Sequence, residues 1–319
     1  MNRKAFFKHF GVIKDHPDLD KITDDAYKQL ERKNWTENLN SSPHGRPWHT
    51  SFHASGFPDK DKPCGRLALY TLMDIPQPEP ASNLLVATGG IGQAVEYQIV
   101  YRWGLAGLTI GGSVPLWDGA SATQCRFEDD SLWLTGSSDA ILDLRQYGFD
   151  SVLPVDIKSK KTEVVQEMQQ GIRSYEDKHY KQVQAYIYLA GIFHDDMGWG
   201  DMGLKPARSA FIYYASRENP RIAHAFYVER DSEFIGRNIE LLQDWQSQFV
   251  NDTLPARPKD WRWTEEPCKW CPMKKYVCKP DYKDGITDLR ESNGVKFAKE
   301  LRQYDYNKTK KEVTRRWQR

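Results

Sequence analysis

The fold class of this chain is decided by Leu153-Pro-Val-Asp156-Ile-Lys158-Ser-Lys-Lys161, a run of strand-forming residues that ends on charged side chains. Residues two apart in a strand point the same way, so Asp156 and Lys158 are expected to face one site. Upstream, Thr135-Gly-Ser-Ser-Asp139-Ala-Ile-Leu-Asp-Leu144 places another aspartate where a turn enters a strand. If the two strands pair as a hairpin, Asp139 can reach the same site from the neighbouring strand.

This combination of two aspartates and a lysine suits the hydrolysis of a phosphodiester. A hard cation such as Mg²⁺ or Mn²⁺ takes carboxylate oxygens, polarises a phosphoryl oxygen and lowers the pKa of the attacking water. A nearby lysine can orient the water and offset the developing negative charge. An Asp-x-Lys triplet is common by chance, however, and also describes a strand end with solvated charges. The surrounding elements therefore have to support the interpretation.

Strand and helix patterns follow one another along the chain and predict an α/β core in one main domain. The expected strands cover residues 112–116, 122–128, 132–135, 139–144, 151–158, 209–215 and 222–228. The expected helices cover residues 24–39, 64–73, 84–103, 162–175, 179–193 and 231–250. The last of these has apolar residues spaced three and four apart, as an amphipathic helix requires.

Composition and charge narrow the class of protein. The 319 residues are 39% hydrophobic and 28% charged, which is typical of a soluble globular chain. No apolar run reaches the roughly 18 to 20 residues of a membrane span, and residues 1–10 lack the apolar core of a secretory signal. A cytoplasmic location without a membrane partner is therefore expected.

The charge is unevenly distributed, although the formal net charge is only +1. Residues 296–319 contain nine Lys or Arg against three acidic residues, which makes this segment about +6 and the remainder about −5. A basic segment beside an acidic body fits a protein that contacts nucleic acid while keeping a carboxylate site. A solvated, frayed C-terminal helix would give the same charge.

Three of the five cysteines cluster in Cys268-Lys-Trp-Cys271-Pro-Met-Lys-Lys-Tyr-Val-Cys278. Closely spaced thiolates favour a soft metal, either zinc or an iron–sulfur cluster, and a fourth ligand would have to come from Cys64 or Cys125. A structural zinc knuckle is the plainer alternative. Cys125, within Gln-Cys-Arg-Phe, is typical of a half-buried strand cysteine.

The order of these motifs resembles the PD-(D/E)xK nuclease superfamily, in which an aspartate and an apolar strand precede a motif such as Val155-Asp156-Ile157-Lys158. Its RecB-like branch also carries a helical Gln-x-x-x-Tyr after the lysine, and this chain has Gln182-Val-Gln-Ala-Tyr186. The spacing of four places Gln182 and Tyr186 on one helix face, where they could contact DNA or brace the site. Gln184 and Tyr188 repeat the pattern two residues later, so the register stays open.

The chain departs from this resemblance at one metal ligand. The family usually has a helical histidine in a Gly-x-x-x-His context before the sheet, whereas the matching stretch here is Gly89-Gly-Ile-Gly-Gln93-Ala-Val-Glu96. Gln93 stands where the histidine is expected, and Glu96 is close enough to supply a carboxylate instead. The implied metal ligands are thus Asp139 and Asp156 together with Gln93 or Glu96.

Cys64-Gly-Arg66 resembles the N-terminal Cys-x-Arg helix of the iron–sulfur exonucleases in this branch, which include CRISPR-associated and phage-encoded members. The resemblance implies a [4Fe–4S] cluster held by Cys64, Cys268, Cys271 and Cys278. It also implies a nuclease-like core, with a central mixed sheet flanked by helices and closed by a cluster that joins its N- and C-terminal parts. The family's last cysteine spacing is more often five than the six found here.

These features predict a Mg²⁺- or Mn²⁺-dependent exonuclease that acts on single-stranded or end-bearing DNA. The predicted catalytic residues are Asp139, Asp156, Lys158, Gln182 and Tyr186. The expected organisation is an N-terminal helical and loop extension over residues 1–60, a nuclease domain with its cluster over 61–280, and a basic tail over 281–319.

Partners and two rival functions complete the sequence-based expectations. The chain has no Gly-x4-Gly-Lys-Ser/Thr motif, so a motor would have to come from a partner such as a helicase or a recombination protein. The first rival is a non-catalytic DNA-binding or adaptor protein that keeps the fold, which Gln93 would explain. The second is a site-specific endonuclease of the same superfamily.

Overall fold

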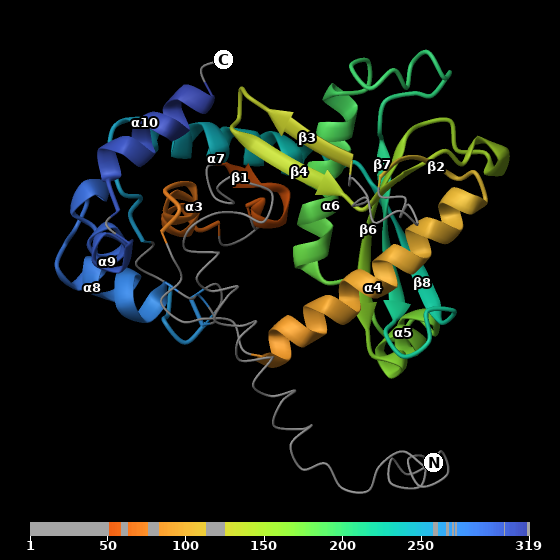
Figure 1. Cartoon of the computed structure of the whole chain (residues 1–319), viewed down its shortest axis with the longest axis horizontal. Coiled ribbons are helices and arrows are strands. Elements are labelled where there is room, and N and C mark those ends of the chain that lie inside the picture. Colours follow the sequence, from red (N-terminus) through yellow and green to blue (C-terminus); the bar gives the residue numbers. More distant parts are fainter. Residues whose placement is uncertain are drawn as a thin grey trace, which may run out of the picture.

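The computed structural model describes residues 51–58, 63–75, 83–112, 125–257, 261–265, 268–269, 271, 273–302 and 304–317 (Figure 1). The helix expected over residues 24–39 lies outside them, as do parts of the strands expected over 112–116 and 122–128. Within the described residues the chain is a mixed α/β protein, with helices packed against two sheets. None of the described helices is long and apolar enough to cross a membrane.

The larger sheet has five strands in the order β2-β5-β6-β7-β8. Their bounds are β2 Thr109–Gly112, β5 Ala140–Leu142, β6 Leu153–Lys160, β7 Ser209–Ser216 and β8 Ala223–Glu229. Strands β6 and β7 are parallel and the other neighbours are antiparallel, which confirms the expected mixed sheet. The expected hairpin is also present, because Ala140 lies opposite Val155 and Leu142 opposite Leu153.

Three helices pack on this sheet, namely α4 (Asn83–Leu105), α5 (Thr162–Gln169) and α6 (Asp177–Ile192). Val155 and Ile157 on β6 belong to an apolar cluster with residues of α4. Side chains alternate along a strand, so Asp156 and Lys158 project from the opposite face, toward α6. Helices α5 and α6 also form the crossover that two parallel strands require.

A smaller sheet of three strands has the order β1-β4-β3, with β1 at Phe52–His53, β3 at Cys125–Asp129 and β4 at Leu134–Ser138. Only Asp139 separates β4 from β5, so one extended segment passes from the small sheet into the large one at this residue. The Ser138 hydroxyl stabilises the crossing, since it accepts a hydrogen bond from the Val155 amide at 3.2 Å and lies 2.8 Å from the Ala140 carbonyl.

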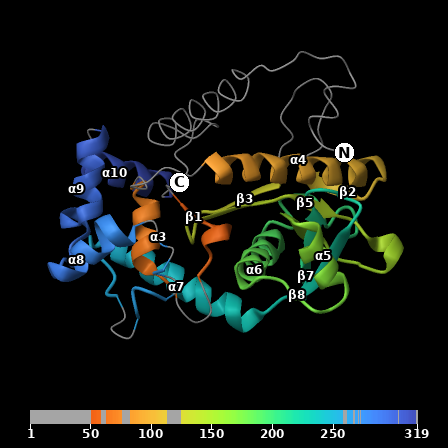
Figure 2. The ribbon, with the colours of Figure 1, turned by 90° about the horizontal axis from the view of Figure 1, so that it is seen from below.

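The remaining helices are α3 (Gly65–Leu72), α7 (Ser232–Val250), α8 (Lys279–Lys283), α9 (Asn293–Arg302) and α10 (Tyr306–Arg316). Figures 1 and 2 both show α3, α8, α9 and α10 at the opposite end of the molecule from α5 and β2. Helix α7 begins where the sequence predicts, because the Asp231 side chain accepts a hydrogen bond from the Phe234 amide at 2.9 Å.

The basic C-terminal segment is packed into the fold and does not extend as a tail. Where residues 281–319 are described they are largely helical, and Val295, Ala298, Val313 and Trp317 are buried in the main apolar core. The Tyr304 hydroxyl donates a hydrogen bond to the Met73 carbonyl at 3.0 Å. The segment after α3 and the C-terminal segment, which are far apart in the sequence, are therefore in direct contact.

Several element boundaries differ from the sequence-based expectation. Helix α5 ends at Gln169, six residues early, because Gly171 adopts a left-handed conformation with φ of 72° and redirects the chain. Strand β2 begins at Thr109, three residues before the expected range of 112–116, and Thr109 pairs with Leu142 at the far end of β5. Residues 113–116 of that range lie outside the described residues. Strand β4, expected over 132–135, covers Leu134–Ser138.

Candidate active site

Asp139 and Asp156 come together at one edge of β6. Strand β5 pairs with β6 only as far as Val155, so the following residues of β6 have no β5 neighbour. Asp139 occupies this edge, and its Oδ2 accepts a hydrogen bond from the Ile157 amide at 2.6 Å. Asp156 is fully buried, while Asp139 is 7% exposed. The crossing between the two sheets thus places one aspartate beside the other.

Lys158 completes this group but leaves one oxygen without a partner. Its Nζ donates a hydrogen bond to Asp156 Oδ1 at 2.8 Å, which is the i, i+2 pairing expected from the strand pattern. The second oxygen, Asp156 Oδ2, is buried and has no hydrogen-bond partner among the residues that the structure describes. A buried carboxylate oxygen in this state carries a desolvation penalty that a hydrogen bond or a bound cation would offset.

The electrostatics of the site reflect crowded negative charge. Burial raises the pKa of Asp139 well above its usual range, and the carboxylates of Asp156 and Glu96 raise that pKa further. Burial also raises the pKa of Asp156, against the opposing effect of Lys158. Burial by itself lowers the pKa of Lys158, but the neighbouring carboxylates outweigh it and the net shift is upward, so the lysine stays protonated.

Glu96 and Gln93 lie on the turn of α4 that passes over the end of β6. A Cβ added to Gly92 would lie only 3.3 Å from Ser159 Oγ, which shows how closely this turn approaches the strand. Glu96 is partly buried and acts electrostatically on Asp139 and Lys158, whereas Gln93 is exposed. When ionised, the three carboxylates of Asp139, Asp156 and Glu96 outnumber the single ammonium of Lys158 by two charges.

Helix α6 brings Gln182 and Tyr186 to this group. Tyr186 is fully buried, and burial followed by the charges of Asp156 and Asp139 raises its pKa well above the usual value. Gln182 Nε2 donates a hydrogen bond to the Tyr186 hydroxyl at 2.7 Å. This pair therefore faces the carboxylates across the α6 side of the sheet.

The alternative register of the motif has a different place in the fold. Gln184 Nε2 donates to the Glu229 carbonyl at 2.7 Å, and its Oε1 accepts from the Asp231 amide at 2.9 Å. The Tyr188 hydroxyl donates to Asp129 Oδ2 at 2.8 Å, on the small sheet. Gln184 thus fixes the β8–α7 junction, and the Gln182–Tyr186 pair is the one that the structure brings to Asp139 and Asp156.

His179 and Tyr214 also lie next to this site, and the sequence motifs do not identify them. Tyr214 stands opposite Lys158 in the β6–β7 register, and its hydroxyl is 2.6 Å from His179 Nδ1. Burial, followed by the charge of Lys158, lowers the pKa of His179 to about 3, so the imidazole is neutral. The signal for His179 was its helix position, because it precedes Gln182 by three residues and Tyr186 by seven.

The donor set of this site fits a hard divalent cation. Among the residues that the structure describes, no three His, Cys, Asp or Glu are arranged to hold a metal ion. Mg²⁺ needs few ligands from the protein, since it usually takes one or two carboxylates and fills its remaining positions with water and substrate phosphate. The buried Oδ2 of Asp156, which has no hydrogen-bond partner among the described residues, and the nearby carboxylate of Asp139 suit such an ion.

Cys64, Cys268, Cys271 and Cys278 lie close enough to act electrostatically on one another, but among the described residues no three of them are arranged to hold a metal ion. Burial raises the pKa of the Cys64 thiol to about 11, with smaller contributions from Cys271 and Cys268. Burial raises the pKa of Cys278 to about 12, and Cys64 and Cys271 contribute there too. Burial alone raises the pKa of Cys125, on β3, to about 12, so this thiol stands apart. All five are free thiols.

A buried polar network next to these cysteines joins α3 to the C-terminal segment. The Tyr70 hydroxyl donates to Asp281 Oδ2 at 2.5 Å, and Asp281 Oδ1 accepts from the Asn293 amide at 2.6 Å. Arg66 Nε donates to the Pro255 carbonyl at 2.7 Å, and its Nη1 lies 3.9 Å from Asp281 Oδ2. We call Arg66, Tyr70 and Asp281 the clasp, because they connect residues 211 or more positions apart.

Comparison with known proteins gives distant structural likenesses. No protein-family model matches the sequence, and no curated protein is significantly similar to it. LHK-Exo in complex with dAMP is 14% identical with a TM-score of 0.39, covering 63% of this chain and 90% of that chain. A structure of this alkaline exonuclease from Laribacter hongkongensis is 12% identical with a TM-score of 0.36, covering 63% and 88%.

A phage-related exonuclease from Haemophilus somnus is 17% identical with a TM-score of 0.30, covering 51% of this chain and 72% of that chain. At these identities and TM-scores the function has to be argued from the site itself.

Proposed function

We propose that this chain is a Mg²⁺- or Mn²⁺-dependent deoxyribonuclease. The observation that carries the proposal is the buried, unpartnered Oδ2 of Asp156, placed beside Asp139 and Lys158. A buried carboxylate oxygen without a partner is costly, and a hard cation that accepts oxygen ligands removes this cost. Asp139 and Asp156 would hold the ion, and Glu96 could contribute directly or through water.

The residues of the site then have separate roles. The bound ion would supply a Lewis acid for the phosphoryl oxygen and an attacking water of lowered pKa. Lys158 keeps its proton, so its ammonium can orient the water and offset charge that develops on the phosphate. Gln182 donates a hydrogen bond to the Tyr186 hydroxyl and would thereby hold the Tyr186 side chain beside the carboxylates. His179 on α6 and Tyr214 on β7 would support Lys158.

We infer exonuclease action on single-stranded or end-bearing DNA from the resemblance of the motif order to RecB-like exonucleases. A non-catalytic DNA-binding or adaptor protein would keep the same fold but would not use the Asp156 oxygen. A site-specific endonuclease would use the same carboxylates and would also cut closed circular DNA. A helicase or recombination partner would extend the range of substrates.

Asp156→Asn tests the catalytic role most directly. The amide has nearly the same shape but cannot provide the charge that the ion needs, so cleavage should fall by at least about 100-fold, as for other losses of charge stabilisation. Asp143→Asn is the matched control, because Asp143 lies just after β5 but pairs with Arg145 at the surface. Digestion of linear DNA labelled at the 5′ or the 3′ end measures cleavage and its direction.

Cleavage should require Mg²⁺ or Mn²⁺, should fail with Ca²⁺ and should stop in excess EDTA. Robust digestion by Asp156→Asn, or by the wild-type protein in EDTA, would refute the metal mechanism. A wild-type protein that binds DNA without cutting it under any of these ions would support the adaptor alternative. Cutting of closed circular DNA would favour the endonuclease.

We also propose that Cys64, Cys268, Cys271 and Cys278 hold a [4Fe–4S] cluster. Support comes from the gathering of these thiols from both ends of the chain and from the suitability of four thiolates for iron–sulfur ligation. The cluster would have a structural role and, like the clasp, would connect α3 to the C-terminal segment. Anaerobically purified protein should be brown with about four irons per chain. A colourless protein with one zinc would identify the zinc alternative.

Cys64→Ser and Cys125→Ser distinguish the ligand sets. Cys64→Ser should lose iron and visible absorption, whereas Cys125→Ser should keep both, because Cys125 lies on β3 apart from the other thiols. The reverse pattern would show that Cys125 is the fourth ligand.

A further inference from the structure

Helix α10 is fixed to the body of the protein through its inner face. Tyr306, Val313 and Trp317 are buried in the main core. Lys310 donates to the Val250 carbonyl at 2.9 Å and forms an ion pair with Asp252, and Arg316 lies 3.5 Å from Glu128. Two of the basic side chains of this helix therefore serve as anchors.

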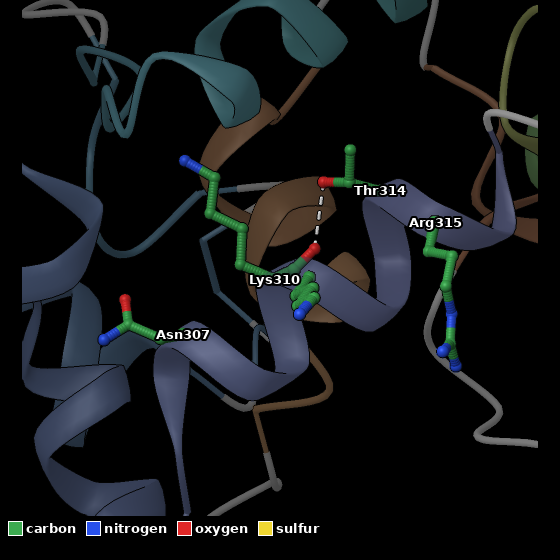
Figure 3. A pocket seen from close by; sticks show the side chains of 5 residues that line it. Asn307, Lys310, Thr314 and Arg315 are labelled. Carbon is green, nitrogen blue, oxygen red and sulfur yellow. Dashed lines mark hydrogen bonds between the residues drawn. The ribbon is translucent and has the colours of Figure 1, made fainter.

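One side of α10, which includes the anchored Lys310, lines a hollow of about 420 Å³ (Figure 3). Its lining residues are Asn307, Lys310, Lys311, Thr314 and Arg315, which we call the α10 groove. Their spacing of three and four places them on one helix face.

The donors of the α10 groove that remain available are few and cationic. Asn307, Lys311 and Arg315 are exposed, and within the described part of the chain no ion pair holds Lys311 or Arg315. The Thr314 hydroxyl already donates to the Lys310 carbonyl at 2.9 Å, as the dashed line in Figure 3 shows. An ammonium, a guanidinium and an amide are left to face the hollow.

We propose that the α10 groove binds phosphates of a DNA strand at a place distinct from the carboxylate site. The inference rests on the proposed nuclease function and adds a second contact for the same substrate. Lysine and arginine together with an amide are the side chains that bind phosphate oxygens, and arginine can do so through two parallel hydrogen bonds. Two of the positive charges of the basic segment, Lys311 and Arg315, thereby gain a role, whereas Lys310 and Arg316 on the same helix are engaged by the body.

The position of α10 indicates what the groove would contribute. Figures 1 and 2 both show this helix well apart from α6, the helix that carries Gln182 and Tyr186 of the carboxylate site. A phosphate bound in the α10 groove would therefore belong to a part of the strand remote from the scissile bond. Such a contact raises affinity for a long strand without reading its sequence.

A pair of double variants tests this assignment. Lys311→Gln with Arg315→Gln removes two charges from the groove. Lys296→Gln with Lys299→Gln is the matched control, because it removes two charges from exposed positions of α9 in the same basic segment. Binding of a fluorescent single-stranded 20-mer is followed by anisotropy in Ca²⁺ over a range of salt concentrations.

The groove variant should bind roughly 10- to 25-fold more weakly at about 0.1 M salt, and its log–log salt slope should flatten by about 1.4, or about 0.7 for each lost phosphate contact. The control variant should change the slope by much less. Both should retain the melting temperature of the wild type, because the four side chains are exposed.

Three results would overturn the proposal. Equal weakening in the two double variants would mean that only overall charge matters. Displacement of the 20-mer by millimolar inorganic phosphate from the wild type but not from the groove variant would identify a site for free phosphate. Unchanged binding by the groove variant, with wild-type cleavage intact, would refute the groove alone. A wild-type protein that neither binds nor cuts DNA would also refute the proposed function.

Discussion

Tyr70→Phe is the substitution for which the structure predicts the stability change most directly. It deletes one hydroxyl and keeps the ring, which is fully buried in the core. Burial, with the charge of Asp281 second, raises the pKa of Tyr70, so this hydroxyl is a proton donor at all ordinary pH values. After the substitution Asp281 Oδ2 keeps only Arg66 Nη1, at 3.9 Å, which is beyond hydrogen-bond distance.

The expected cost follows from the charge and burial of the acceptor. A hydrogen bond to a charged group contributes about 1.5–3 kcal/mol, and Asp281 is fully buried, so water cannot replace the lost donor. For 319 residues the entropy of unfolding is about 0.67 kcal/mol per kelvin, so the melting temperature should fall by roughly 2–4 °C. Differential scanning calorimetry under reducing conditions measures this change.

Tyr282→Phe is the control, because Tyr282 adjoins Asp281 in the sequence but is 47% exposed. Its melting temperature should stay within about 1 °C of the wild type, as expected for a surface substitution. If the melting temperature of Tyr70→Phe is not lower than that of Tyr282→Phe, the hydrogen bond from Tyr70 to Asp281 does not stabilise the fold.

Three further predictions concern the site and its supports. Gln184→Ala should lower the free energy of unfolding by about 1–3 kcal/mol, because the Glu229 carbonyl and the Asp231 amide lose their partners. Gln182→Ala should mainly lower cleavage. Urea titration and the nuclease assay separate the two effects, and equal stabilities of the two variants would contradict the prediction. Gly136→Ala should cost about 1–3 kcal/mol, since its Cβ would lie 2.8 Å from Leu189 Cδ1, while Gly236→Ala on α7, with nothing within 4 Å, should be slightly stabilising in the same titration. His179 has a pKa of about 3 in the folded protein and 6.5 in the unfolded chain, so the unfolded chain binds the proton first as the pH falls. The wild type should therefore lose stability relative to His179→Gln between pH 6.5 and pH 3, by up to about 1.4 kcal/mol per pH unit. Parallel curves of stability against pH for the two proteins would contradict this prediction.

The sequence was informative wherever the relevant contact is local. The i, i+2 relation of Asp156 and Lys158, and the i, i+4 relation of Gln182 and Tyr186, follow from the periods of a strand and a helix. In the structure a hydrogen bond joins the two members of each pair. The β5–β6 hairpin joins strands that follow one another in the sequence, with residues 143–152 between them.

The sequence left open the choices that depend on packing. Gln182-x-x-x-Tyr186 and Gln184-x-x-x-Tyr188 have the same local geometry, and they differ only in which side of α6 meets the large sheet. Gln93 and Glu96 are likewise one turn apart on α4. The packing of α4 against β6 leaves Gln93 exposed and makes Glu96 the one that acts on Asp139.

By itself, then, the sequence determined the main strands and helices of the core and the shared face of Asp156 and Lys158, because strand and helix periods are properties of neighbouring residues. Only the tertiary structure decided that Asp139 lies at the crossing between two sheets and that the basic C-terminal segment packs into the core. It alone decided that Tyr70 binds Asp281 across 211 residues. Such contacts form between segments remote in sequence, and their partners are selected by the burial of the whole core, which no local pattern encodes.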